Sequence, residues 1–196
     1  MGAIFQSLGR TVTAGVVLML ILVGIAASHN AQFDHTWWAF FMRYLHIASG
    51  VMWIGLLWYF NFVQVPGMPK IPDEQKPAVT KVIAPSALFW FRWAALATVI
   101  TGLLVAAMNG YIGSALALQP PFLGIGLGMW MALIMAFNVW FLIWPNQKKV
   151  LGIVQVEAAE KAKAAKVALF ASRFNTMFSI PMLFCMAAQS HGGGLG

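Results

Sequence analysis

The stretch that decides the fold is RYLHIASGVMWIGLLWYF, which covers residues 43–60. Its length and apolar character are typical of a helix that crosses a membrane. It nevertheless contains two ionisable side chains, Arg43 and His46. Because ionisable residues are costly in hydrocarbon, a residue of this kind within a span indicates a functional role.

The composition of the whole chain agrees with a membrane protein. Of its 196 residues, 61% are hydrophobic and 9% are charged, whereas about 25% are charged in an average soluble domain. The apolar runs must therefore face lipid, and we expect the lipid bilayer to be the main partner. A net charge of +7 would also suit nucleic acid, but in so apolar a chain we interpret it as a record of membrane topology and expect no nucleic-acid partner.

We predict an all-α integral membrane protein, a bundle of five transmembrane helices that forms a single membrane domain over residues 1–196. Five apolar segments have the length that a hydrocarbon core of about 30 Å requires. The first could pass for a signal peptide, but its length and the next span close behind it favour a helix. The predicted spans cover about residues 11–28, 37–63, 87–108, 122–144 and 174–189.

The lysines and arginines orient these spans. With a cytoplasmic N-terminus, eleven of the twelve lie on the inner side, and only Arg43 lies in the outer half. We therefore predict a multi-pass protein of the bacterial inner membrane with a periplasmic C-terminus. Residues 146–172 are predicted to form a cytoplasmic helical loop. That loop is either a solvated helix or a surface for anionic lipid head groups or a soluble partner.

His46 is the candidate on which the functional interpretation depends. It lies about nine residues into the second span, roughly 13 Å below the Trp37–Trp38 pair at 1.5 Å per residue. Gly50 and Trp53 follow on the same helix face, and the glycine leaves room for a flat cofactor or a close helix. Neutral imidazole can bind haem iron or another metal. The alternatives are a structural histidine bonded to a neighbouring carbonyl, or a proton relay.

Further polar residues extend this candidate site. Arg43 lies one turn outward from His46, where it could balance a haem propionate, pair with Asp34 or extend to the head groups. His191 follows the last span and is a candidate second axial or metal ligand. A polar stripe within the last span predicts hydrogen bonds to other helices and consists of Ser172, Asn175, Thr176 and Ser179.

Two kinds of metal chemistry are disfavoured by the sequence. The chain has one cysteine, Cys185, and no CxxCH motif, which excludes covalent c-type haem within these residues. A copper transporter would need methionines or histidines that form a ladder across the bilayer. The histidines are predicted to stop in the outer half, so copper is ranked last.

Four blocks of sequence together resemble a known family, the urate oxidase N-terminal (membrane) domain of cytochrome-c-linked bacterial urate oxidases. The likeness extends from about Arg43 to His191. The LHxxSGxxWxG pattern around His46 is also similar, more loosely, to membrane haem proteins of the protoporphyrinogen oxidase and copper-resistance families. The four blocks are YLHIASGVMWIGLLWYFNFVQVP, FWFRWAALATVITGLL, NVWFLIWPNQKKVLG and ASRFNTMFSIPMLF.

The resemblance implies a membrane-embedded redox subunit that passes electrons to a c-type cytochrome on the periplasmic side. In the more loosely similar families a histidine early in a helix serves a b-type haem or a metal, and with His46 in that place we expect a b-type haem near the periplasmic face. Longer family members carry that cytochrome at their C-terminus, so a separate one is expected here. The alternative is a cofactor-free accessory subunit of a larger respiratory or photosynthetic membrane complex. Enzyme activity and substrate stay open, with Asn61, Asn138 and Arg92 as candidate polar contacts.

Overall fold

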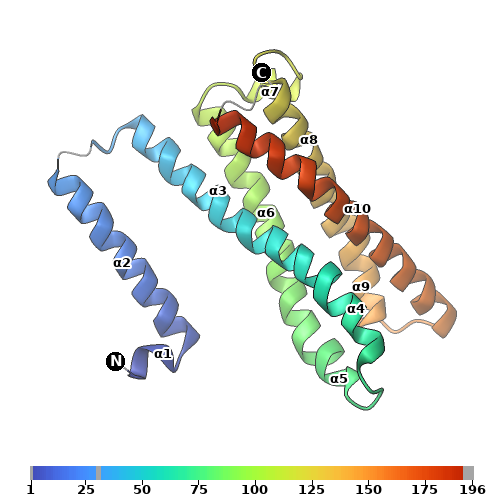
Figure 1. The fold of residues 1–196 in the computed structure, drawn as a ribbon. Coiled ribbons are helices and arrows are strands. Elements are labelled where there is room, and N and C mark those ends of the chain that lie inside the picture. Colours follow the sequence, from blue (N-terminus) through green and yellow to red (C-terminus); the bar gives the residue numbers. More distant parts are fainter. Residues whose placement is uncertain (1, 30–31, 192–196) are drawn as a thin grey trace. The chain divides into compact units, whose positions relative to one another are not determined.

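The computed structural model describes residues 2–29 and 32–191, and the chain divides into two compact units, residues 1–40 and 41–196. All regular secondary structure in the described residues is helical (Figure 1). Five helical runs are long and apolar enough to cross a membrane, as the sequence predicted. These runs are Leu8–Ser28, His35–Lys70, Lys76–Met108, Leu123–Val150 and Ala158–Gln189.

The first unit contains α1 (Gly2–Phe5), α2 (Leu8–Ser28) and the start of α3 (His35–Trp58). Asp34 precedes α3, and its Oδ1 accepts a hydrogen bond of 3.0 Å from the Trp37 backbone N–H. A carboxylate at this position satisfies one of the amides that a helix start leaves without a partner. The second apolar run therefore begins at a capped helix terminus.

The second unit is built from long helical runs that are interrupted by short π-helical segments. The second run continues from α3 through η1 (Tyr59–Gln64), α4 (Val65–Gly67) and η2 (Met68–Lys70). The third consists of α5 (Lys76–Ala78), η3 (Val79–Ile83) and α6 (Ala84–Met108). After α7 (Ile112–Leu116), the fourth consists of α8 (Leu123–Phe137), η4 (Asn138–Ile143) and α9 (Trp144–Val150).

Each of the three π-helices, η1, η3 and η4, ends two residues before a proline, which is Pro66, Pro85 or Pro145. Proline has no N–H to donate, and its ring collides with the carbonyl four residues earlier. A wider turn moves that carbonyl away without ending the helix. The prolines thus explain where the long runs depart from α-helical geometry.

The last run, α10 (Ala158–His191), is a single helix that contains Pro181. Its 34 residues correspond to about 51 Å, well beyond a hydrocarbon core of about 30 Å. The predicted span 174–189 is therefore only the C-terminal part of a longer helix. The N-terminal part contains Lys161, Lys163 and Lys166, and a turn over residues 151–157 separates it from α9.

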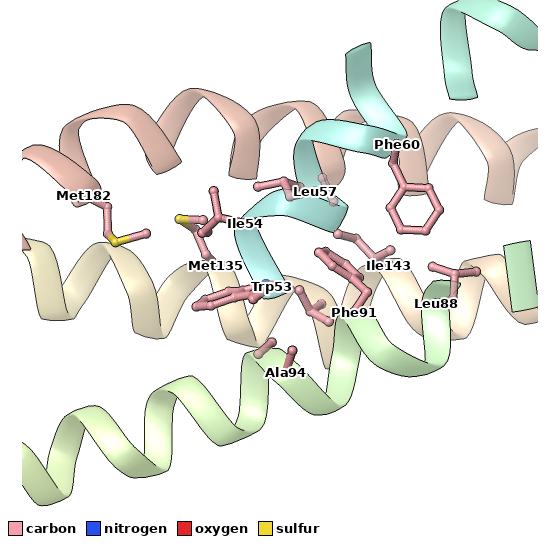
Figure 2. Packing of buried hydrophobic residues seen from close by; sticks show 13 residues of the cluster. Trp53, Ile54, Leu57, Phe60, Leu88, Phe91, Ala94, Met135, Ile143 and Met182 are labelled. Carbon is pink, nitrogen blue, oxygen red and sulfur yellow. The ribbon is translucent and has the colours of Figure 1, made fainter. Parts of the chain in front are cut away.

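The main core of the second unit lies where α3, α6, α8 and α10 meet. Trp53 and Leu57 of α3 are completely buried and pack with Phe91 of α6 and Met135 of α8. Figure 2 shows Trp53 on the side of α3 that faces Phe91 and Ala94, with Met182 of α10 in the same cluster. This packing fixes the face of α3 that also carries His46.

Glycines of α8 bring neighbouring helices close. A Cβ at Gly126 would collide with the backbone carbonyl of Ala115 in α7, and one at Gly128 would lie 3.0 Å from Cβ of Cys185 in α10. Both glycines belong to the run GIGLG, residues 124–128, and small residues of this kind commonly mark close helix contacts in a membrane. Here the contacts are made within the chain itself.

Candidate functional site

His46 of α3 is held against α6 by a hydrogen bond to the backbone. Its Nδ1 lies 2.9 Å from the carbonyl oxygen of Thr98. A carbonyl only accepts, so Nδ1 carries the proton and donates it there. The hydroxyl oxygen of Thr101, which itself donates to Ala97, lies 3.4 Å from the same nitrogen. Of the two tautomers of a neutral imidazole, this bond selects the one that carries the proton on Nδ1.

A glycine allows the imidazole to lie this close to α6. A Cβ at Gly102 would be 2.8 Å from Cε1 and 3.0 Å from Nδ1 of His46. Thr98, Thr101 and Gly102 share one face of α6 at i, i+3 and i+4. Together they form a cradle for the ring, which we call the His46 cradle.

The second ring nitrogen of His46 has no hydrogen-bond partner among the groups that the structure describes. In the tautomer with the proton on Nδ1, Nε2 keeps its lone pair. The side chain is half-buried rather than enclosed. The cradle therefore orients an imidazole whose Nε2 can accept a hydrogen bond or bind a metal ion.

Gly50 and Trp53 lie on the face of α3 that carries His46, and both face α6. A Cβ on Gly50 would make ordinary contact, 3.8 Å, with Cγ2 of Thr98. The predicted close helix is therefore present at this glycine. Trp53 is completely buried in the main core, and its indole Nε1 has no partner within the described residues. The structure thus brings His46 and Gly50 to one stretch of α6 and places Trp53 in the core beside it.

Arg43 is exposed on α3 and acts electrostatically on Tyr111 in the loop between α6 and α7. Burial raises the pKa of the Tyr111 hydroxyl, and the charge of Arg43 partly opposes that rise. The Tyr111 ring stacks on Phe122 with centroids 5.1 Å apart. Arg43 is therefore a cation beside a partly buried phenol, one helical turn from His46.

His191 is the last residue of α10, and its side chain lies outside the part of the chain that the structure describes. Figure 1 shows this end of α10 near α7, and Met186 packs against the cluster that includes Ala115 and Ile125. The described residues contain no group of three or more His, Cys, Asp and Glu side chains that could hold a metal. Ligation by His191 therefore stays a prediction.

The polar stripe of α10 forms the predicted hydrogen bonds to other helices. Asn138 Nδ2 donates to Asn175 Oδ1 at 2.8 Å, and Asn175 Nδ2 donates to the Met135 carbonyl at 2.9 Å. Two further bonds reach α10, from Asn61 Nδ2 to Ser172 Oγ at 2.8 Å and from Trp58 Nε1 to Ser179 Oγ at 2.9 Å. Thr176 is the exception, because its hydroxyl donates to the Ser172 carbonyl of its own helix.

The remaining candidate polar contacts are explained largely by packing. The side-chain N–H of Asn138 donates to Asn175, so this amide serves helix packing. The guanidinium carbon of Arg92 lies 3.8 Å from the ring centroid of Trp144, a cation–π geometry. Arg92 Nη1 and Asn61 Oδ1 are buried without a hydrogen-bond partner in the described part of the chain.

A comparison of the sequence with known protein families gives a match over the region that contains the polar stripe of α10. Residues 117–193 match the family described as Urate oxidase N-terminal. The predicted resemblance to the urate oxidase N-terminal family is therefore confirmed over these residues, which are the C-terminal part of the stretch that the sequence indicated. The matched residues contain α8, η4, α9 and α10. No match was found among curated proteins or solved structures.

The urate oxidase N-terminal match and the His46 cradle occupy different parts of the chain. The matched residues hold the buried pair of Asn138 and Asn175. The cradle lies on α3 and α6, before the match begins. The match and the five apolar helices together fit a membrane subunit. The match therefore does not include His46.

The sequence did not single out the α6 side of the cradle. Thr98, Thr101 and Gly102 form the short pattern TVITG, in which two hydroxyl residues and a glycine share one helix face. Small and hydroxyl residues of this kind commonly mark a close helix contact in a membrane. That signal could have placed α6 opposite the histidine, although not in this register.

Proposed function

We propose that the chain is a membrane-embedded electron-transfer subunit in which His46 binds b-type haem through Nε2 near the periplasmic face. The observation that carries this proposal is the bond from His46 Nδ1 to the Thr98 carbonyl, 2.9 Å long. Histidines that bind metals almost always donate their other ring N–H to a carbonyl, carboxylate or water. The His46 cradle supplies that second contact.

Three features of the structure prepare His46 for ligation. Thr98 fixes the tautomer, so that no proton has to leave Nε2 before it binds iron. Gly102 allows the ring to rest on α6, and a ring held on one side loses little further freedom on binding. The buried cluster around Trp53 and Phe91 keeps α3 and α6 together beneath it. The bound haem would supply a one-electron carrier.

Two further residues complete the proposed site. Arg43, exposed one turn from His46, would neutralise a haem propionate through a charge-assisted hydrogen bond. His191, at the end of α10, would provide a second ligand for the haem iron. The bias of lysines and arginines supports a periplasmic position for this end, where a separate c-type cytochrome would receive the electrons.

Absorption spectra of the purified protein test this proposal. The wild type, expressed with haem supplied, is compared in detergent in the oxidised and dithionite-reduced states with His46→Ala and with His35→Ala. His35 is exposed at the start of α3 and serves as the matched control. We expect a sharp reduced α-band in the wild type and in His35→Ala, and its loss in His46→Ala. A featureless wild-type spectrum, or a band unaffected by His46→Ala, would contradict haem ligation by His46.

A second candidate is a cofactor-free accessory subunit of a larger membrane complex. The observation that favours it is that Gly50, expected to leave room for a cofactor, is met by Thr98. A histidine bonded to a neighbouring helix carbonyl also suffices as a structural contact. This candidate predicts a colourless protein that is recovered with partner subunits when the membrane is solubilised gently.

A further inference from the structure

A cavity of about 230 Å³ lies between α9 and the first turns of α10, far along the chain from the His46 cradle. Both helices contribute to its wall, which contains polar, charged and apolar side chains. We call it the α9–α10 cavity. Its lining residues are Asn146, Lys149, Glu160, Lys163, Ala164 and Val167.

The charges in this cavity leave a net positive site. Lys149 Nζ lies 2.6 Å from Glu160 Oε1, and this ion pair joins the two helices across the cavity. Lys163 also lines the cavity, and no acidic side chain in the described part of the chain forms an ion pair with it. The lining therefore has two cations and one anion, so an anionic ligand would balance it.

The cavity also contains acceptors for hydroxyl groups. Asn146 Nδ2 is engaged with the Leu142 carbonyl at 2.8 Å, so the amide oxygen of Asn146 is the atom that can turn to a ligand. The Glu160 carboxylate has acceptor capacity beyond its bond to Lys149. A ligand with both a phosphate and hydroxyl groups would match this combination.

The position of the cavity indicates where such a ligand comes from. α9 ends the apolar run Leu123–Val150 and α10 begins the run Ala158–Gln189, so the cavity lies at the end of two membrane-length helices. Ala164 and Val167 form its apolar wall, and Phe170, one turn further along α10, is 75% exposed. Further lysines lie on both helices beside the cavity, and their charge adds to the attraction for an anionic leaflet. They are Lys148, Lys161 and Lys166.

We propose that the α9–α10 cavity binds the head group of an acidic phospholipid that carries free hydroxyls, such as phosphatidylglycerol. Lys163 and Lys149 hold the phosphodiester, Asn146 and Glu160 accept from the hydroxyls, and the acyl chains run along Val167 and Phe170. Basic pockets between membrane helices are a recognised form of lipid site. The inference requires membrane insertion, but it does not depend on haem.

Native mass spectrometry of the full chain in detergent tests this inference. Phosphatidylglycerol and phosphatidylcholine are added in equal amounts, and the retained copies of each lipid are counted. Lys163→Gln removes one cavity charge, and Lys81→Gln, an exposed lysine outside the cavity, is the matched control. A lysine near an anionic surface contributes about 1 kcal/mol, and about 1.4 kcal/mol is tenfold, so Lys163→Gln should lower the preference for phosphatidylglycerol roughly fivefold.

A second variant, which should bind the lipid more tightly, separates a loss of binding from a loss of folding. Glu160→Gln removes the anion and frees the Lys149 charge, while the amide oxygen of the new side chain can still accept from a head-group hydroxyl. Its preference for phosphatidylglycerol should therefore exceed that of the wild type. Three results would overturn the inference. They are equal retention of both lipids by the wild type, equal losses in Lys163→Gln and Lys81→Gln, or displacement of the lipid by millimolar inorganic phosphate, which would indicate a small-anion site. The number of retained lipids is measured independently of haem content. The experiment therefore tests the lipid site even if the absorption spectra contradict haem binding.

Discussion

The imidazole of His46 rests on Gly102, so close that a Cβ at position 102 would come within 2.8 Å of Cε1. The same ring donates to the Thr98 carbonyl one turn away on α6. The position of the ring therefore depends on the absence of a side chain at residue 102. This dependence allows the site to be perturbed while the histidine itself is kept.

Gly102→Ala should move His46 without removing it. The added methyl group would force the ring away from α6 and weaken its bond to Thr98, and overpacking of this kind usually costs about 1–3 kcal/mol. We expect a lower thermal unfolding midpoint in detergent and, if haem is bound, a shifted or weakened α-band. Gly55→Ala on α3 is the control, because nothing lies within 4 Å of its Cβ. Equal behaviour of the two variants would show that the cradle does not constrain the ring.

Asn175→Leu should destabilise the α8–α10 contact. Asn175 is completely buried, and its loss would leave Asn138 Nδ2 without a partner. It would also remove one donor from the Met135 carbonyl, which still accepts from the backbone N–H of Asn138. A buried polar group left unpaired costs about 1–3 kcal/mol. The double variant with Asn138→Leu should lose less than the single variant, since it removes the orphaned amide. Denaturant titrations would measure both, and a larger loss in the double variant would refute this account.

Gly126→Ala should be the most damaging of the glycine substitutions. A Cβ there would meet the backbone carbonyl of Ala115 rather than a flexible side chain, so relief requires a shift of α7 against α8. We expect about 3 kcal/mol or more of destabilisation and a low yield of monodisperse protein. Gly113→Ala, with nothing within 4 Å of its Cβ, should behave as the wild type in size-exclusion chromatography. A well-folded Gly126→Ala would show that α7 is not packed as described.

Lys76→Gln should change the titration of Asp73 in the loop before the third apolar run. The pKa of Asp73 is lowered by its hydrogen bond and charge interaction with Lys76, 2.6 Å away. The interaction is present at neutral pH and is lost as the pH falls through the folded-state pKa of Asp73. In the variant that pKa should return towards its ordinary value, as carboxyl carbon NMR would detect. Because Asp73 is fully solvated, the thermal midpoint at neutral pH should not change.

The sequence predicted the helical architecture well, because apolar runs long enough to cross a bilayer are typical of helices. It placed five apolar helices, and it identified the α10 stripe as a source of interhelical hydrogen bonds; Ser172, Asn175 and Ser179 form such bonds in the structure. The ends of the helices were harder to predict. Lysine-rich and alanine-rich residues after the turn continue α10 beyond any hydrocarbon core, so hydropathy alone could not mark where the helix begins.

Only the α3 half of the candidate site was predicted from the sequence. His46 was identified because an ionisable residue stands out in an apolar helix, and Gly50 followed from helical spacing. The cradle on α6 depends on how two helices cross, and this crossing is set by packing of Trp53 and Phe91. Periodicity within one helix contains no information about register between helices, so Thr98 and Gly102 could not be assigned to His46 in advance.

The three π-helices also determine how this chain should be aligned with related sequences. A π-turn is equivalent to an α-helix with one residue too many, held by the proline that follows it. A relative without the proline could lack one residue there and still present the same faces to its neighbours. Single-residue gaps are therefore expected near Tyr59–Gln64, Val79–Ile83 and Asn138–Ile143, whereas a gap elsewhere in a span would turn every later side chain away from its contact.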